Sequence, residues 1–117
     1  MLTKYALPMT HRGLGEFEQM VLLAIAHLGG EAYGVPIVEE IERRTGRSVA
    51  RAAVYITLRR LEEKGFVTSW MSDPTPERGG KARRCVRLTP AALESLRLSR
   101  QALDSMWKGL DPGLRRP

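Results

Sequence analysis

Apolar residues recur every three or four positions in four stretches of the chain, and this spacing predicts four helices. The first stretch runs from Glu16 to Leu28, is apolar over much of its circumference, and stops at a pair of glycines. The second has Pro36 in a position that suits a first helical turn, and it stops at Gly46. The chain is therefore predicted to begin its ordered part with two consecutive short helices.

A third helix is predicted from about Ala50 or Arg51 to Lys64, because Val54, Leu58 and Leu61 are spaced i, i+4 and i+7. On a helical wheel its opposite face is polar, apart from small residues and one isoleucine. That face carries Ala52, Ala53, Ile56, Arg59, Arg60 and Glu63. A helix with this face is suited to contact with something outside the chain.

Two further stretches are rich in residues that favour strands, at Phe66–Met71 and Arg84–Leu88. The loop between them contains two prolines and a glycine pair, so the two strands should form a hairpin. Alternation along the second strand predicts that Val86 and Leu88 face the core, and that Arg83, Cys85 and Arg87 face the other way. Thr89-Pro90 then provides an N-cap and a first-turn proline for a fourth helix, from Ala91 to about Gly109.

This order of elements predicts an α+β, mainly helical fold: a winged helix-turn-helix with an additional C-terminal helix. Residues 1–13 show no periodicity and are expected to form an arm whose order depends on a partner. The winged helix-turn-helix domain is expected to cover residues 14–89, the C-terminal helix residues 90–110, and a tail residues 111–117. A length of 117 residues fits one domain.

The positive charge of the chain is concentrated in one segment. Residues 43–87 hold twelve Lys and Arg against four Asp and Glu, or +8, while the whole chain is +6, so that the remainder is −2. Such an asymmetry favours a polyanion as the partner over a uniformly solvated basic surface, which is the alternative.

Several classes of protein do not fit the composition. The two histidines, His11 and His27, have no nearby nucleophile or paired carboxylates, which disfavours an enzyme, and no group of ligands for a metal or another cofactor is apparent. No apolar run approaches a membrane span and no signal peptide is evident, so we expect a cytoplasmic protein that does not bind membranes. The single cysteine, Cys85, agrees with a reducing compartment.

The sequence also resembles the PadR-like transcriptional regulators, with the short C-terminal helix of the smaller members. The likeness covers roughly residues 13–110 and is carried by GEFEQMVLLAIAHLGGEAYGVPIVEEIERRTG, AVYITLRRLEEKGFV and PTPERGGKARRCVRLTPAAL. It implies a homodimer that binds pseudo-palindromic operator DNA, usually as a repressor, with the first and fourth helices in the dimer interface. Two positions depart from the usual pattern: Ala50 stands where the third helix would have an N-cap, and Cys85-Val86 replaces a pair of tyrosines.

Double-stranded DNA is therefore the expected partner, contacted by the third helix and by the wing. Bases or phosphates are expected to be contacted by Arg51, Ala52, Ala53, Tyr55, Ile56, Arg59, Arg60, Arg78, Lys81 and Arg83. The alternative for Ile56 is packing on a neighbouring segment. The alternative for the whole domain is a protein-interaction or RNA-binding module without operator specificity, although few exposed aromatic residues are available for RNA.

The second expected partner is another copy of the chain. The dimer interface is expected to contain Phe17, Met20, Leu93, Leu96, Leu103, Met106, Trp107 and Leu110. By resemblance Trp107 is also a candidate contact for a small aromatic effector, although packing in the core or the dimer is the more frequent role of such a tryptophan. Cys85 is either an unreactive strand residue or a redox sensor activated by Arg83 and Arg87.

Overall fold

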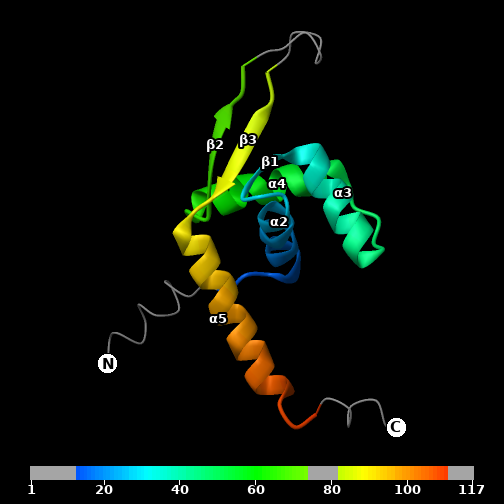
Figure 1. Cartoon of the computed structure of the whole chain (residues 1–117), viewed down its shortest axis with the longest axis vertical. Helices are drawn as coiled ribbons and strands as arrows, with labels where there is room; N and C mark the ends of the chain where they lie inside the picture. Colours follow the sequence, from blue (N-terminus) through cyan, green and yellow to red (C-terminus); the bar gives the residue numbers. More distant parts are fainter. Residues whose placement is uncertain (1–12, 74–81, 111–117) are drawn as a thin grey trace.

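The computed structural model describes residues 13–73 and 82–110. In chain order the elements are α2 (Glu16–His27), β1 (Glu31–Tyr33), α3 (Gly34–Thr45), α4 (Arg51–Glu63), β2 (Val67–Met71), β3 (Arg84–Leu88) and α5 (Pro90–Trp107) (Figure 1). The four helices predicted from apolar spacing are all present, with ends within about two residues of the predicted ones. The winged-helix fold is confirmed.

The helix ends are set by the residues that the sequence singled out. Gly46 ends α3 with φ +73°, a left-handed conformation that glycine adopts without strain. At the start of α5 the Thr89 Oγ1 accepts a hydrogen bond of 3.3 Å from the backbone N–H of Ala92, and Pro90 occupies the first helical position. Local chemistry thus fixes where the second half of the fold begins.

The predicted hairpin is present as β2 and β3, and a third strand, β1, which was not predicted, joins it. The sheet has three antiparallel strands in the order β1-β3-β2, so the hairpin's second strand lies in the middle. The extra strand β1 pairs Ala32 with Val86 and Tyr33 with Cys85. With only three residues between Gly30 and Gly34, β1 is too short to show an alternating pattern.

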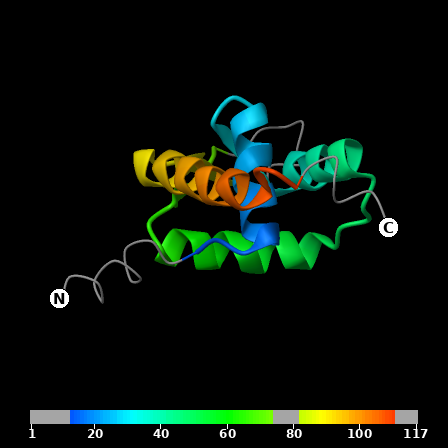
Figure 2. The same ribbon diagram turned by 90° about the horizontal axis from the view of Figure 1, so that it is seen from below.

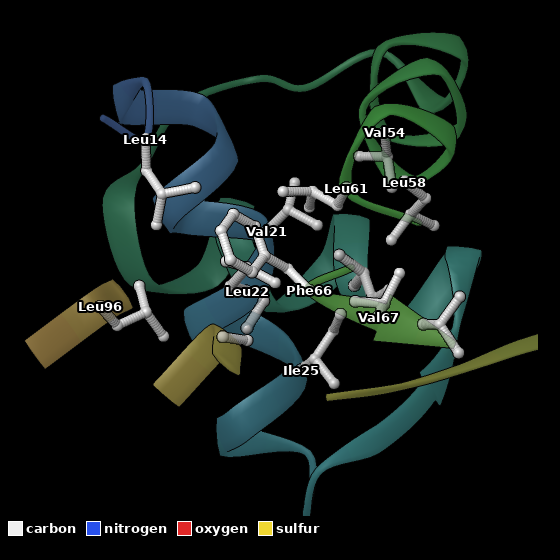
Figure 3. Packing of buried hydrophobic residues seen from close by; sticks show 14 of the residues in the cluster. Leu14, Val21, Leu22, Ile25, Val54, Leu58, Leu61, Phe66, Val67 and Leu96 are labelled. Atoms are coloured by element: carbon white, nitrogen blue, oxygen red, sulfur yellow. The ribbon is translucent and has the colours of Figure 1, made fainter. Parts of the chain in front are cut away.

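The core lies between α2, α4 and the inner face of the sheet (Figure 3). Val21, Leu22 and Ile25 of α2 are fully buried against Val54 and Leu61 of α4. Val86 of β3 is buried and Leu88 packs on the same cluster, as the alternation predicted. Helix α4 is thereby fixed by one face alone.

The hairpin and α5 leave the body at opposite ends of the molecule (Figure 1). Seen from below, α4 runs along one edge with its outer face turned away from the other helices (Figure 2). Helix α5 is anchored by Ala92 and Leu96, which are buried in the core, whereas every residue from 101 to 110 is exposed. The second half of α5 therefore contributes no residue to the core of the described chain.

Candidate nucleic-acid interface

Helix α4 presents a continuous outer face. Burial of Val54, Thr57, Leu58 and Leu61 turns the remaining positions outward. The exposed residues of the outer face are Arg51, Ala52, Tyr55, Ile56, Arg59, Arg60 and, at the C-terminal end, Glu63, with Ala53 partly buried. Ile56 is 56% exposed, so it does not pack on a neighbouring segment of the described chain.

Tyr55 is positioned by a glycine on another helix. The backbone of Gly34, at the start of α3, is buried beside the Tyr55 ring. A Cβ atom built on Gly34 would lie 2.2 Å from Cε1 and 2.7 Å from the hydroxyl oxygen of Tyr55, so only glycine leaves room for the ring. The ring remains 47% exposed, which leaves part of it at the outer face.

The turn that leads into α4 is held by side chains of α3. The Glu42 carboxylate accepts a hydrogen bond of 2.8 Å from the backbone N–H of Val49. The Thr45 hydroxyl donates to the carbonyl of Ile41 and accepts from the N–H of Arg47. Ala50 provides no side-chain cap to α4, as its sequence implied, so the entry angle of the helix depends on these bonds from α3.

The Lys and Arg side chains between positions 43 and 87 fall into two groups, those that form ion pairs and those that do not. Six of them are bound to carboxylates: Arg43 and Arg44 to Glu40, Arg47 to Glu16, Lys64 to Glu18, Arg84 to Glu62, and Arg87 to Glu31. Arg51, Arg59, Arg60 and Arg83 form no ion pair with a carboxylate in the described part of the chain. Uncompensated positive charge is therefore concentrated on α4 and at the base of the wing, which the sequence count could not show.

A buried ion pair fixes the C-terminal end of α4 to α2. Lys64 Nζ lies 2.9 Å from Glu18 Oε2, and the N–H of Gly15 donates to Glu18 Oε1 at 2.9 Å. Burial raises the pKa of the Glu18 carboxyl, but the bonds from Lys64 and Gly15 and the charges of Lys64 and Arg60 outweigh it, so the pKa is lowered overall. Glu18 is therefore a charged, bonded carboxylate at neutral pH.

At the base of the wing two arginines lie over aromatic rings. The guanidinium of Arg83 is 4.0 Å from the centroid of the Tyr33 ring, and that of Arg87 is 5.1 Å from the Trp70 ring. Arg83, Cys85 and Arg87 lie on the face away from the core, as predicted. Arg78 and Lys81, which the sequence assigned to DNA contact, lie outside the described residues.

Helices α2 and α5 enclose a groove of about 600 Å³. Four of the residues assigned to dimerisation, Leu93, Leu96, Leu103 and Trp107, line it, together with Gln19, Leu23 and Ala26 of α2. Met106 is 75% exposed and Leu110 is also exposed. The groove thus combines much of the exposed apolar surface of α5 with one side of α2.

Three of the residues predicted to form the dimer interface are not on the exposed surface of the chain. Leu96 is buried in the chain's own core, and Phe17 and Met20 are partly buried and pack against that core. Leu23, which is 45% exposed and lines the groove, was not selected from the sequence. Its spacing from Gln19 and Ala26 could have indicated a second side of α2.

A family model for the Transcriptional regulator PadR-like family matches residues 22–97, more than half of the chain. The chain belongs to this family. The resemblance noted in the sequence is thereby confirmed, and the family comprises transcriptional regulators, not enzymes. No curated protein sequence matches the chain.

Solved structures of family members show the same fold. A PadR family transcriptional regulator from Eggerthella lenta is 22% identical, with a TM-score of 0.66 over 99% of this chain and 94% of that one. A PadR-like transcriptional regulator from Bacillus cereus is 18% identical, with a TM-score of 0.68 over 86% and 93%. Bacillus subtilis PadR, solved in complex with operator DNA, is 19% identical, with a TM-score of 0.60 over 70% of this chain and 45% of that one.

The described residues contain neither a metal-ligand group nor a helix that could span a membrane. Within residues 13–73 and 82–110, no three His, Cys, Asp or Glu side chains are grouped so that they could hold a metal ion. In the same residues, no helix combines the length and the hydropathy that a bilayer span requires.

Proposed function

We propose that this PadR-like regulator is a sequence-specific repressor that binds a pseudo-palindromic DNA operator as a homodimer. The observation that carries the proposal is the outer face of α4, where Arg51, Arg59 and Arg60 are exposed and unpaired in the described chain while nearby cations are bound to carboxylates. An unpaired guanidinium can bind phosphate or the edge of guanine without first breaking an ion pair.

The shape of this face also fits the major groove. Ala52 and Ala53 are small enough to let the helix backbone approach the base edges, and the exposed Ile56 can contact the methyl group of thymine. Tyr55 and Arg60 lie on the same face and would contact the DNA backbone. We therefore propose that Arg51, Ile56 and Arg59 read the bases.

The wing is assigned a positioning role. Arg83 lies at its base, and Arg78 and Lys81, outside the described residues, belong to the loop that the sequence places at its tip. Contacts of such residues to phosphates or to the minor groove add affinity for any duplex. Their loss should therefore weaken operator and random DNA about equally.

To test sequence-specific binding by α4, an operator is first selected from a random duplex library. Affinity for this operator is then measured by fluorescence anisotropy. Arg51→Ala and Arg59→Ala should each weaken operator binding by about 5- to 150-fold if the side chain reads a guanine. Arg43→Ala is the matched control, because it removes the same charge from an exposed arginine that is bound to Glu40. Equal losses of operator affinity in all three variants would mean that the α4 arginines contribute only non-specific electrostatic attraction and do not read bases.

The same assay distinguishes an operator-binding repressor from the alternative, a protein-interaction or RNA-binding module without operator specificity. Single-stranded DNA and RNA of the operator sequence are measured beside the duplex, and we expect at least a tenfold preference for the duplex. A preference for RNA or single-stranded DNA would support the nucleic-acid-binding module without operator specificity. Absence of binding to any of the three would support the protein-interaction module.

The homodimer is supported by the apolar surface that α5 exposes. Leu93, Leu103, Met106, Trp107 and Leu110 are each about half exposed or more. Burying the exposed half of five such side chains is worth roughly 4–8 kcal/mol per chain, at about 1.5–3 kcal/mol for each fully buried side chain. Two chains would gain roughly 8–16 kcal/mol, comparable with the cost of association, and burial of Leu23 on α2 adds to this.

Sedimentation equilibrium at micromolar concentration tests the dimer. Leu103→Asp should give a monomer, whereas Met71→Asp, a matched change at an exposed apolar residue of β2, should leave the dimer intact. A monomeric wild-type protein would remove the interface and the spacing of two recognition helices that it is proposed to set.

Trp107, 46% exposed in the groove, is the proposed contact for a small aromatic effector between two copies. If its role is packing instead, Trp107→Ala should weaken the dimer. If it is an effector contact, the variant should remain dimeric and bind flat aromatic ligands more weakly than the wild type.

A further inference from the structure

The outer face of the sheet contains a second cavity, on the side away from the core and separate from the groove between α2 and α5. Its volume is about 350 Å³, within the range of small-molecule sites. It is lined by Leu28, Glu31, Ala32, Tyr33, Pro36, Trp70 and Cys85. These residues come from the end of α2, from all three strands and from the first turn of α3.

The strand register places two aromatic residues on either side of this cavity. Cys85 of the middle strand is paired with Tyr33 of β1 and with Trp70 of β2. Neighbouring strands lie about 4.8 Å apart, so the two aromatic positions are roughly 10 Å apart. Stacked aromatic rings are separated by about 4.5–7 Å, so a flat ring above Cys85 would be within contact of both side chains.

The charge beside the cavity is positive and partly uncompensated. Arg83 lies over the Tyr33 ring and has no ion pair with a described carboxylate, whereas Arg87, over the Trp70 ring, is bound to Glu31 at 2.7 Å. One guanidinium is therefore available at the Tyr33 end of the cavity to bind an anionic group.

We propose that this cavity binds a flat aromatic molecule that carries a negative charge, with its ring between Tyr33 and Trp70 and its anionic group on Arg83. Two sources share this chemistry, a mononucleotide and an aromatic carboxylate. The experiment below distinguishes them.

The cavity is connected to both elements of the DNA interface. Tyr33 is the N-cap residue of α3, and the next residue, Gly34, contacts Tyr55 of α4. Arg83 is itself a proposed DNA contact, so a ligand that binds its guanidinium withdraws it from the phosphates. This step rests on the proposed function, and we expect bound ligand to weaken operator affinity about fivefold or more.

Binding can be measured without DNA, because the chain holds only two tryptophans and one cysteine. In the Trp107→Phe protein Trp70 is the sole tryptophan, and its emission is followed during titration with adenosine monophosphate and, separately, with benzoate. In the wild-type protein the rate of alkylation of Cys85 by iodoacetamide is followed with the same two compounds. We expect at least one of them to change the Trp70 emission saturably, with a dissociation constant below about 1 mM, and to slow alkylation several-fold.

The source and the charge are then assigned by comparison. Saturation by adenosine monophosphate alone indicates a nucleotide, and saturation by benzoate alone indicates a carboxylate. Adenosine and benzamide, which lack the charge, should bind at least fivefold more weakly, as should the charged compounds to Arg83→Gln. Arg43→Gln, at an exposed arginine of α3 that is bound to Glu40, is the matched control and should bind as the wild type does.

If neither compound changes the Trp70 emission or the alkylation of Cys85, the site is refuted. Equal binding of charged and uncharged compounds would refute the role of Arg83. Both results are independent of operator binding. A failure of the repressor proposal is seen in the DNA titrations and not here.

Discussion

Replacing Gly34 by alanine should strain the contact between α3 and the recognition helix. The new Cβ would lie 2.2 Å from Cε1 of Tyr55, and ordinary contacts begin at 3.4 Å, so the ring has to move by about 3.4 − 2.2 = 1.2 Å. Because the ring is half exposed, it can move outward. The destabilisation from this overpacking should be about 1–3 kcal/mol. Alanine recovers about 0.4–1 kcal/mol by restricting the unfolded chain. The net loss should be about 0–2.6 kcal/mol.

A double-mutant cycle isolates the contact. The free energy of unfolding is measured by urea titration for the wild type, Gly34→Ala, Tyr55→Ala and the double variant. Without the ring, Gly34→Ala should stabilise the protein by about 0.4–1 kcal/mol, which gives a coupling energy of about 1–3 kcal/mol. Gly13→Ala, where no atom lies within 4 Å of the added Cβ, is the matched control and should show no coupling to Tyr55→Ala.

Additivity within about 0.5 kcal/mol would refute this reasoning, because the ring would then not oppose the added methyl group. Operator affinity gives a second measurement. If the displaced ring disturbs the outer face of α4, Gly34→Ala should bind the operator more weakly even where it is as stable as the wild type.

Three other outcomes are expected. The lowered pKa of Glu18 means that its bond to Lys64 stabilises the fold above the pKa of the unfolded carboxyl, about 4.3, and that this stability is lost as pH falls through the folded pKa. The free energy of unfolding should therefore fall more between pH 7 and pH 3 in the wild type than in Glu18→Gln, and equal falls would contradict the assignment. Ile56→Ser should leave the free energy of unfolding within about 0.5 kcal/mol of the wild type while weakening operator binding; unchanged binding would exclude an apolar base contact. Arg83→Ala should reduce the slope of log affinity against log salt by about 0.9, one phosphate contact, with Arg43→Ala unchanged, and an unaltered slope would place Arg83 away from phosphate.

The helices could be predicted because their information is local. The spacing of Val54, Leu58 and Leu61 defines the inner face of α4, and Gly46 and Thr89 mark helix ends through their own backbone and hydroxyl chemistry. The outward direction of Ile56 follows from the same period. These features need no knowledge of distant parts of the chain.

The features that the sequence did not reveal depend on distant neighbours. Strand β1 exists because Tyr33 and Ala32 pair with β3, more than fifty residues later. Neutralisation of Lys64 by Glu18 links residues 46 positions apart, so a count of charges included Lys64 in a basic surface to which it contributes little. Leu96 has the spacing of the other apolar residues of α5, and only the fold shows that it is covered by its own chain.

The division of α5 into an anchored and a free half makes folding separable from assembly. Ala92 and Leu96 are buried in the chain's own core, whereas none of residues 101–110 is buried within the described structure. A chain shortened after Arg100 should therefore keep its winged helix and exist as a single copy. Substitutions in the last turns of α5 can thus change which chains associate, and how strongly, without loss of the fold that would recognise DNA.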